Sequence, residues 1–299
     1  MRIFALELDN DIKGIRERDA YTQELIASLP SPDLVVLPEL SRTGYMASQK
    51  IWEFADDGGV STAEWAVRMA SAYNTFIAAG YLDREDGHYY NRYMIAGPGG
   101  VCGHVSKSEG EAAVFRRGSF GSVIETPFGN VGVAICYDSR RRHFYDNVKD
   151  RQLSLILFPH GAPADPSKPE REREETERRC TAYADAFGVP VVYVNCKGEL
   201  EYMPGMMGAM MKRHGFRMNG MSRIFAEGAR PIVTGIPEAV GAQIDIAPRA
   251  RTKDIRFYGE DILPGNRLFR ALILGPDTKA GIRSYEANRR GIVQEPFRR

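Results

Sequence analysis

"VGVAICYDSRRR", residues 131–142, places a cysteine at the end of an apolar run and three consecutive arginines a few residues later. The run from Val131 to Ile135 is apolar and contains β-branched residues, so it predicts a buried strand. Cys136 follows at the point where that strand ends. A cysteine in this position is either a small hydrophobic residue of the core or a reactive thiol displayed for chemistry, and this stretch alone leaves both interpretations open.

Two other chemically active side chains also follow apolar runs. Glu39 ends "DLVVLPE", and Lys107 ends the strand-like segment "VCGHVSK". Functional sites of α/β proteins assemble at the carboxyl ends of strands, because loops and helix N-termini meet there. If the three side chains converge, a carboxylate, an ammonium and a thiol would supply a base, an electrostatic stabiliser and a nucleophile.

The rest of the chain alternates apolar strand-like runs with amphipathic helical segments. The predicted strands are 2–8, 33–40, 75–83, 153–161, 189–195 and 240–246; the hairpins are 89–107, 122–138 and 220–237; the helices are 16–30, 61–74, 167–188 and one from about 139. Interleaved strands and helices indicate an α/β protein whose sheets are covered by helices. We expect one large domain over residues 1–265, followed by an extension at 266–299 without a core of its own.

Composition excludes several classes of protein. The 299 residues are 43% hydrophobic and 26% charged, and the net charge of +1 gives no basic footprint for nucleic acid or for a membrane surface. The start "MRIFALELDND" lacks a basic n-region, and no apolar stretch has the length of a transmembrane helix. The four cysteines form no CxxC pair and the histidines no HxxxH spacing. We therefore expect a cytoplasmic protein with reduced thiols, no metal and no cofactor.

With these surroundings the chain resembles the nitrilase superfamily of carbon–nitrogen hydrolases. The motifs are "DLVVLPELSRTGY" (33–45), "YYNRYMIAGPGG" (89–100), "HVSK" (104–107), "EAAVFRRGS" (111–119), "VGVAICYDSR" (131–140), "LILFPHGAP" (155–163), "VPVVYVN" (189–195) and "NGMSRIF" (219–225). The resemblance covers roughly residues 1–250. It implies a four-layer α-β-β-α sandwich, assembled as a homodimer or higher homo-oligomer, and we expect the 266–299 extension to pack on a partner subunit.

The family uses a Glu–Lys–Cys triad, and the resemblance assigns its roles to three matching residues. Cys136 would be the nucleophile, Glu39 the general base and acid, and Lys107 the stabilising cation. The backbone N–H of Tyr137 would help to bind the oxyanion. An auxiliary glutamate maps to Glu111.

Several positions stay open at this point. Glu109 is an alternative to Glu111, because the loop after Lys107 is short, and both glutamates could also be solvated loop residues. Tyr45 and His160 lie within two of the motifs and are further candidates for substrate binding.

The residues after the nucleophile depart from the family, which usually continues "CYDxR" with Phe-Pro-Glu. This chain has Arg141, Arg142 and His143 instead. The two arginines are either a cationic wall for a substrate carboxylate or a solvated or intersubunit ion-pairing face. Asp138 and Arg140 match the family and are expected to orient the turn.

Seven methionines fall in the Gly-rich segment 203–221. Methionine fills irregular apolar surfaces, so this segment is either an adaptable pocket lid or ordinary loop or subunit packing. A copper site with His214 is a weaker alternative, because the glycines interrupt any regular ligand spacing.

The function that the sequence supports best is a thiol-dependent hydrolase of a small linear amide or N-carbamoyl compound, acting through a cysteine thioester. It would release ammonia or an amine and a carboxylic acid. Two alternatives remain: an acyltransferase on the same scaffold, and a catalytically silent nitrilase-like binding protein.

Overall fold

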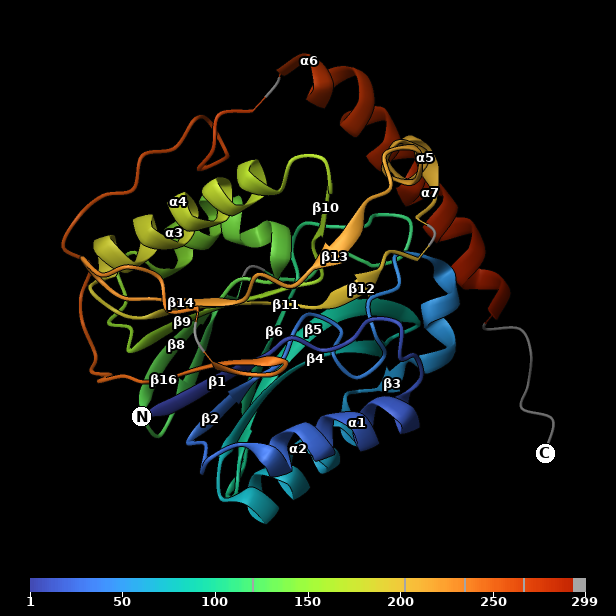
Figure 1. Ribbon diagram of the computed structural model, residues 1–299. Helices are drawn as coiled ribbons and strands as arrows, with labels where there is room; N and C mark the ends of the chain where they lie inside the picture. Colours follow the sequence, from blue (N-terminus) through green and yellow to red (C-terminus); the bar gives the residue numbers. More distant parts are fainter. Residues whose placement is uncertain (120, 202, 234, 266, 293–299) are drawn as a thin grey trace, which may run out of the picture.

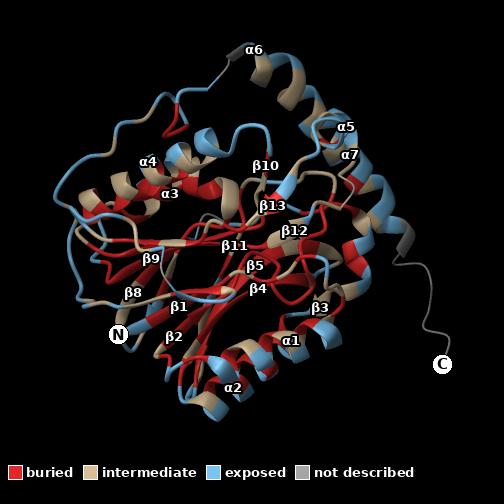
Figure 2. Cartoon of the chain, viewed as in Figure 1, coloured by how far each residue is buried: buried red, intermediate tan, exposed pale blue. Residues whose placement is uncertain are grey.

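The computed structural model describes residues 1–119, 121–201, 203–233, 235–265 and 267–292. Two large β-sheets lie face to face at its centre, and helices cover the outer face of each sheet (Figure 1). The buried residues concentrate in these sheets and on the helix faces that contact them (Figure 2).

The larger sheet has eight strands in the order β15-β16-β1-β2-β4-β5-β6, with β3 pairing with β4. Their bounds are β1 (Arg2–Leu6), β2 (Leu34–Val36), β3 (Asp56–Asp57), β4 (Phe76–Glu85), β5 (His88–Gly97), β6 (Gly100–Ser106), β15 (Gly235–Ile236) and β16 (Ala239–Gln243). Strands β1, β2 and β4 run parallel, and β5 and β6 form the predicted hairpin. Gly97 pairs with Gly100 across its two-residue turn.

The smaller sheet has five strands in the order β14-β11-β9-β8-β7. Their bounds are β7 (Val123–Thr126), β8 (Gly129–Val133), β9 (Leu155–His160), β11 (Val191–Asn195) and β14 (Arg223–Phe225). Strands β8, β9 and β11 are parallel, so their carboxyl ends lie along one edge of the sheet.

The alternation of side chains along each strand explains the layers. On β1, Ile3 and Ala5 belong to the core between the two sheets, whereas Phe4 and Leu6 pack under the helices α1 and α2. The helices are α1 (Ile15–Ser28) and α2 (Val60–Tyr73) on the larger sheet, and α3 (Arg142–Val148) and α4 (Pro169–Phe187) on the smaller one. The result is the four-layer α-β-β-α sandwich that the sequence predicted.

The structure departs from the predicted elements between residues 160 and 237. A third, three-stranded sheet is formed by β10 (Pro163–Ala164), β12 (Lys197–Glu199) and β13 (Arg217–Asn219). The Met-rich segment contains helix α5 (Gly205–Arg213). The predicted hairpin at 220–237 is reduced to a bridge between Ile224 and Ile232, because β15 turns away to pair with β16.

The described part of the C-terminal extension forms α6 (Arg267–Phe269), a π-helical turn η3 (Arg270–Leu274) and α7 (Gly275–Ile292). Residues 266 and 293–299 of that extension lie outside the described residues. Tyr285 of α7 is buried in a cluster with Trp52, Val114 and Phe115 of the same chain. Packing of the extension on a second subunit stays a prediction.

Candidate active site

Glu39 lies just after β2, where the backbone passes so close to the neighbouring strand β4 that β4 must have a glycine at this point. A Cβ at Gly80 of β4 would lie 2.4 Å from the Leu40 nitrogen and 2.8 Å from the Pro38 oxygen. The backbone of residues 38–40 therefore crosses directly over Gly80. This crossing holds the Glu39 side chain inside the protein, where the residue is only 1% exposed.

Cys136 lies three residues beyond the end of β8 and begins the 3₁₀ turn η2 (Cys136–Arg140). Its φ is +51°, in the left-handed region that residues with side chains seldom occupy. The Ser139 hydroxyl donates a 2.6 Å hydrogen bond to the Cys136 carbonyl and closes the turn. Strained backbone of this kind persists only where the surroundings hold it, and it concentrates at functional sites.

Asp138 ties this turn to the loop that carries Lys107. Its carboxylate accepts hydrogen bonds from the backbone N–H groups of Ser108, at 2.8 Å, and Glu109, at 2.7 Å. Because Lys107 directly precedes these two residues, the thiol and the ammonium are held in one fixed framework.

Lys107 bridges the buried carboxylate of Glu39 and the carboxylate of Glu111, whose side chain is 16% exposed. Its Nζ lies 2.6 Å from Glu39 Oε1 and 3.0 Å from Glu111 Oε2. The Tyr45 hydroxyl donates to Glu111 Oε1 at 2.6 Å, which fixes the second carboxylate. Glu39 follows β2 and Lys107 follows β6, two strands of the larger sheet that are not neighbours, and the fold brings the two side chains together.

The Glu39 carboxylate accepts two further hydrogen bonds. Asn91 Nδ2 donates to Oε1 at 2.7 Å, and the Gly161 backbone N–H donates to Oε2 at 2.8 Å. Asn91 comes from β5 and Gly161 directly follows β9, so both sheets contribute to the orientation of the carboxylate.

The pKa values in this cluster follow from burial and from the shared lysine. Burial raises the pKa of Glu39 above its usual 4.5, and the raising effect of Glu111 adds to it, whereas Lys107 opposes it. Burial also acts to raise the pKa of Glu111, but Lys107 and the Tyr45 hydrogen bond outweigh it and lower that pKa. Burial acts to lower the pKa of Lys107, yet the two carboxylates raise it well above 10.5. Glu39 is therefore the better proton acceptor of the two carboxylates.

The Cys136 thiol does not ionise by itself in this environment. Burial raises its pKa well above 9, and the Glu39 charge raises it further, while Lys107 and the Gly161 N–H act in the opposite direction. The lysine is shared by two carboxylates, so its influence on the sulfur is partly neutralised. The thiol consequently needs a base to become a nucleophile.

The structure distinguishes the two candidate auxiliary glutamates by their contacts. Glu111 reaches Lys107, whereas the Glu109 carboxylate pairs with Arg117 at 2.9 Å and with Arg141 at 3.4 Å.

The two arginines after the turn contact protein groups. Arg141 lies between Glu109 and Asp261, with its Nη1 4.0 Å from Asp261 Oδ2. Arg142 donates from Nε to the Gly259 carbonyl at 3.3 Å and covers the Phe257 ring. Binding of a substrate carboxylate by either arginine stays a prediction.

His160 is buried beside the turn η2. Its Nδ1 lies 2.9 Å from the Phe158 carbonyl oxygen, which can only accept, so this nitrogen carries the proton. Its Nε2 lies 3.4 Å from Arg179 Nη2 and 3.3 Å from the Ser139 hydroxyl. Burial and Arg179 lower the pKa of His160 well below 6.5, so the ring is neutral at physiological pH.

The remaining predicted residues also lie around the turn. The Tyr45 hydroxyl is engaged with Glu111, and the Tyr137 ring lies 5.7 Å from the guanidinium carbons of both Arg140 and Arg141. Substrate binding by Tyr45 stays a prediction. Oxyanion binding by the Tyr137 N–H is a proposal.

Sequence reasoning assigned no role to several residues that shape the site. Asn91 and Gly161 both lie in motifs that carried the resemblance, so a signal for them was present. Ser139 lies inside the quoted stretch itself. Asp261 had no signal, because it lies outside every motif and its contact with the turn depends on the tertiary fold.

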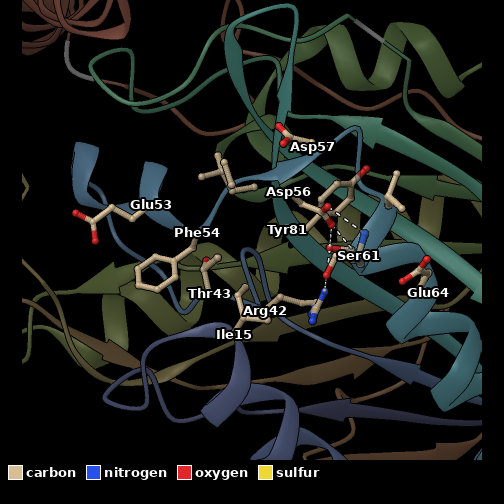
Figure 3. A pocket seen from close by; sticks show the side chains of 14 residues that line it. Ile15, Arg42, Thr43, Glu53, Phe54, Asp56, Asp57, Ser61, Glu64 and Tyr81 are labelled. Carbon is tan, nitrogen blue, oxygen red and sulfur yellow. Dashed lines mark hydrogen bonds between the residues drawn. The ribbon is translucent and has the colours of Figure 1, made fainter. Parts of the chain in front are cut away.

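A cavity of about 440 Å³ opens beside η1 (Gln49–Phe54) and α2, lined by 14 residues that include Arg42, Glu53 and Tyr81 (Figure 3). Three of its charged groups have protein partners: Arg42 pairs with Asp19, Asp57 pairs with Arg84, and Asp56 caps the N-terminus of α2 by accepting from Thr62. Glu39, Lys107, Glu111 and Cys136 are not among the lining residues.

No group of three or more His, Cys, Asp or Glu side chains is arranged to hold a metal ion within the described ranges. None of the helices in the part of the chain that the structure describes has the length and apolar character needed to cross a membrane.

The chain is similar in sequence to several known proteins. A probable nitrilase of Schizosaccharomyces pombe is 28% identical over 138 residues, covering 43% of this chain and 51% of the relative. An omega-amidase of Xenopus laevis is 26% identical over 149 residues, covering 44% of this chain and 53% of the relative. The chain thus spans about half the length of the curated relatives it matches.

Solved structures share the fold. A carbon–nitrogen hydrolase superfamily protein of Xanthomonas campestris, with an arsenic adduct in its active site, superposes with a TM-score of 0.66 at 19% identity, covering 82% of this chain and 90% of the other. Residues 20–244 match the family described as carbon-nitrogen hydrolase, which is most of the chain. The resemblance drawn from the motifs around Glu39 and Cys136 is therefore confirmed, and the chain belongs to the carbon–nitrogen hydrolase family.

Proposed function

We propose that this protein is a thiol-dependent amidase that cleaves the C–N bond of a small linear amide or N-carbamoyl compound. The observation that carries the proposal is the buried Lys107 ammonium, which bridges Glu39 and Glu111 beside a thiol held on a strained turn. The relatives include both a probable nitrilase and an omega-amidase, so the test below includes nitriles as well as amides.

The first half of the reaction forms a thioester. Glu39 removes the proton from Cys136 Sγ as the sulfur attacks the amide carbonyl carbon, and the resulting oxyanion faces Lys107 and the Tyr137 N–H. When the tetrahedral intermediate collapses, the C–N bond breaks and Glu39 gives its proton to the departing nitrogen. Ammonia or an amine leaves, and the acyl group remains on the sulfur.

The second half releases the acid. Glu39, ionised again, removes a proton from a water molecule that attacks the thioester carbon. The C–S bond then breaks, and the proton held by Glu39 returns to the sulfur. Glu111 and Tyr45 take no part in proton transfer in this scheme; they hold Lys107 charged and in place.

The test is ammonia release by the purified protein from a panel of linear primary amides, N-carbamoyl compounds and nitriles. Cys136→Ala is expected to abolish release. Cys102→Ala, which removes another partly exposed thiol, is expected to leave it unchanged. A panel on which Cys136→Ala and the unmodified protein behave alike would contradict the proposal.

The same experiment also tests whether the protein transfers the acyl group to an amine. Added hydroxylamine converts a thioester into a hydroxamate, so hydroxamate formed in place of the acid would show that an amine competes with water. Release of ammonia and free acid without an added amine identifies a hydrolase.

A further inference from the structure

The arginines of the opening stretch contact a C-terminal strap, residues 257–263, which lies beyond the family match at 20–244. The Arg142 N–H donates to the Glu260 carbonyl at 3.0 Å, and the Ile262 N–H donates to the Arg140 carbonyl at 2.8 Å. The strap is therefore joined through the backbone to Arg140, the last residue of η2, and to Arg142 just after it.

Asp261 of the strap directs a carboxylate at that turn. The residue is 1% exposed, and its Oδ1 accepts from Arg140 Nε at 3.4 Å while its Oδ2 lies 4.0 Å from Arg141 Nη1. Ile262 and Leu263 anchor the strap in the apolar core beneath α3 and α4. Because a buried carboxylate needs charged partners, the position of Asp261 is coupled to that of both arginines.

The acidic residue of the turn itself, Asp138, accepts hydrogen bonds from the backbone N–H groups of Ser108 and Glu109. Residues 139–145 contain three arginines and one histidine but no Asp or Glu. The other carboxylates near the arginines, Glu109 and Glu175, have side chains that are 25% and 28% exposed, against 2% for Asp261. Water screens the partly exposed pairs, so the pairs that the arginines form with the buried Asp261 are the least screened of these.

We propose that Asp261 is a positioning residue for the nucleophile turn. It holds Arg140 and Arg141, and through them the turn η2, which carries the Cys136 thiol and the Tyr137 N–H. This inference rests on the proposed function, because it concerns the reactivity of Cys136. Misplacement of a reacting group by about 1 Å costs up to about a hundredfold in rate, so a support at the end of a single 3₁₀ turn affects the chemistry.

The test is the rate at which iodoacetamide alkylates Cys136, followed by peptide mass spectrometry at neutral pH. Asp261→Asn keeps the shape of the side chain and removes its charge, and it is expected to slow alkylation about tenfold. The kcat for ammonia release should fall by a similar factor while KM changes less than about twofold, because the turn holds reacting groups. Asp261→Glu is expected to recover most of the alkylation rate.

Asp254→Asn is the matched control. Asp254 lies in the same C-terminal segment and also pairs with an arginine, Arg251, but its side chain is 83% exposed. This variant is expected to react at the wild-type rate. Arg140→Lys is a second variant: it keeps the charge but lacks Nε, the atom that bonds Asp261, and it should also slow alkylation.

If Cys136 in folded Asp261→Asn is alkylated at the wild-type rate, the inference is overturned. If Asp261→Asn does not fold, the same result in folded Arg140→Lys overturns it. Alkylation requires no amide substrate, so failure of the proposed function is a separate result. In that case the wild-type protein releases no ammonia from any compound of the panel, but Asp261→Asn is still alkylated more slowly than Asp254→Asn.

Discussion

At the residue scale, the proposed chemistry depends on one lysine placed between two carboxylates. If Lys107 paired with Glu39 alone, it would hold that carboxylate ionised and make it a weak base. Sharing the lysine with Glu111 reduces this effect, and burial raises the pKa of Glu39. The base is thereby brought closer to the raised pKa of the Cys136 thiol, which makes proton transfer between them less costly.

Glu111→Gln is the first prediction at this scale. Without the second carboxylate, Lys107 binds Glu39 fully and lowers its pKa, so kcat should fall about a hundredfold in an ammonia-release assay. Glu109→Gln is the natural control, because Glu109 pairs with Arg117 and does not contact Lys107. We expect a loss below about threefold for this variant, and equal losses in the two variants would contradict the assignment of Glu111.

The pH dependence gives a second prediction. Glu39 must be ionised to accept the thiol proton, so kcat/KM should rise with pH through its pKa, and this acid limb should lie above the usual 4.5. Lys107, whose pKa is raised well above 10.5, and His160, whose pKa is lowered well below 6.5, do not titrate near neutral pH. In Glu111→Gln the negative charge that raises the pKa of Glu39 is lost, so the acid limb of kcat/KM should move to lower pH. A limb that stays in place or moves upward would show that Glu111 does not act on Glu39.

The residues of this cluster differ in how far the sequence could predict them. Glu39, Lys107 and Cys136 were predicted together because each follows an apolar run inside a family motif. Choosing Glu111 over Glu109 required the structure, since two residues in one short loop differ only in where their side chains point. Asp261 could not be predicted, because its partners lie about 120 residues earlier and the contact exists only after folding.

At the scale of elements, helix α7 supports the loop that carries Glu111. Gly281 of α7 lies so close to that loop that a Cβ there would be 2.9 Å from the Ala113 nitrogen. Asp277, on the same helix, accepts from the Met206 N–H at the start of α5 and so joins the Met-rich helix to α7. Sequence periodicity indicated neither contact, because both depend on the packing of one helix on distant segments.

Gly281→Val tests this support. The added side chain must push α7 away from Ala113, and overpacking of this kind costs about 1–3 kcal/mol of unfolding free energy. We also expect kcat to fall, because the displaced loop carries Glu111. Ala280→Val adds a β-branched side chain at the neighbouring exposed position of the same helix and should change neither quantity by more than the helix-propensity difference. Urea unfolding and ammonia release measure the two effects.

At the scale of the whole molecule, the four layers follow from binary patterning. Alternating strands such as β1, and runs such as Leu34–Val36 that are buried on both faces, require cover on each side, and the predicted helices supply it. The short strands β10, β12 and β13 have no such pattern, since two or three residues give no periodicity. The pattern therefore predicted sheets covered by helices, and the family resemblance added the four-layer arrangement. The segments that join the ends of the sandwich were predicted poorly.

The last prediction concerns a chain that ends at residue 265. This truncation removes Tyr285, whose hydroxyl accepts the Tyr89 N–H at 3.0 Å and whose ring packs edge-on against Trp52 at 5.7 Å. A buried N–H left without a partner costs about 1–3 kcal/mol, and the lost burial of an aromatic side chain adds a similar amount. We therefore expect the free energy of unfolding in urea to fall by about 3 kcal/mol or more. Tyr285→Phe, which removes only the hydroxyl, should reproduce the first part of the loss.

Two measurements on the truncated chain separate packing within the chain from packing between subunits. Equal unfolding free energies of the full and truncated chains would contradict the intrachain role of α7. Light scattering of the same two proteins tests the sequence prediction that the extension packs on a partner subunit, because that prediction requires a lower subunit count after truncation. If the count is unchanged while stability and kcat both fall, the extension acts through the loop of Glu111 in its own chain, as the contacts of Gly281 and Tyr285 lead us to expect.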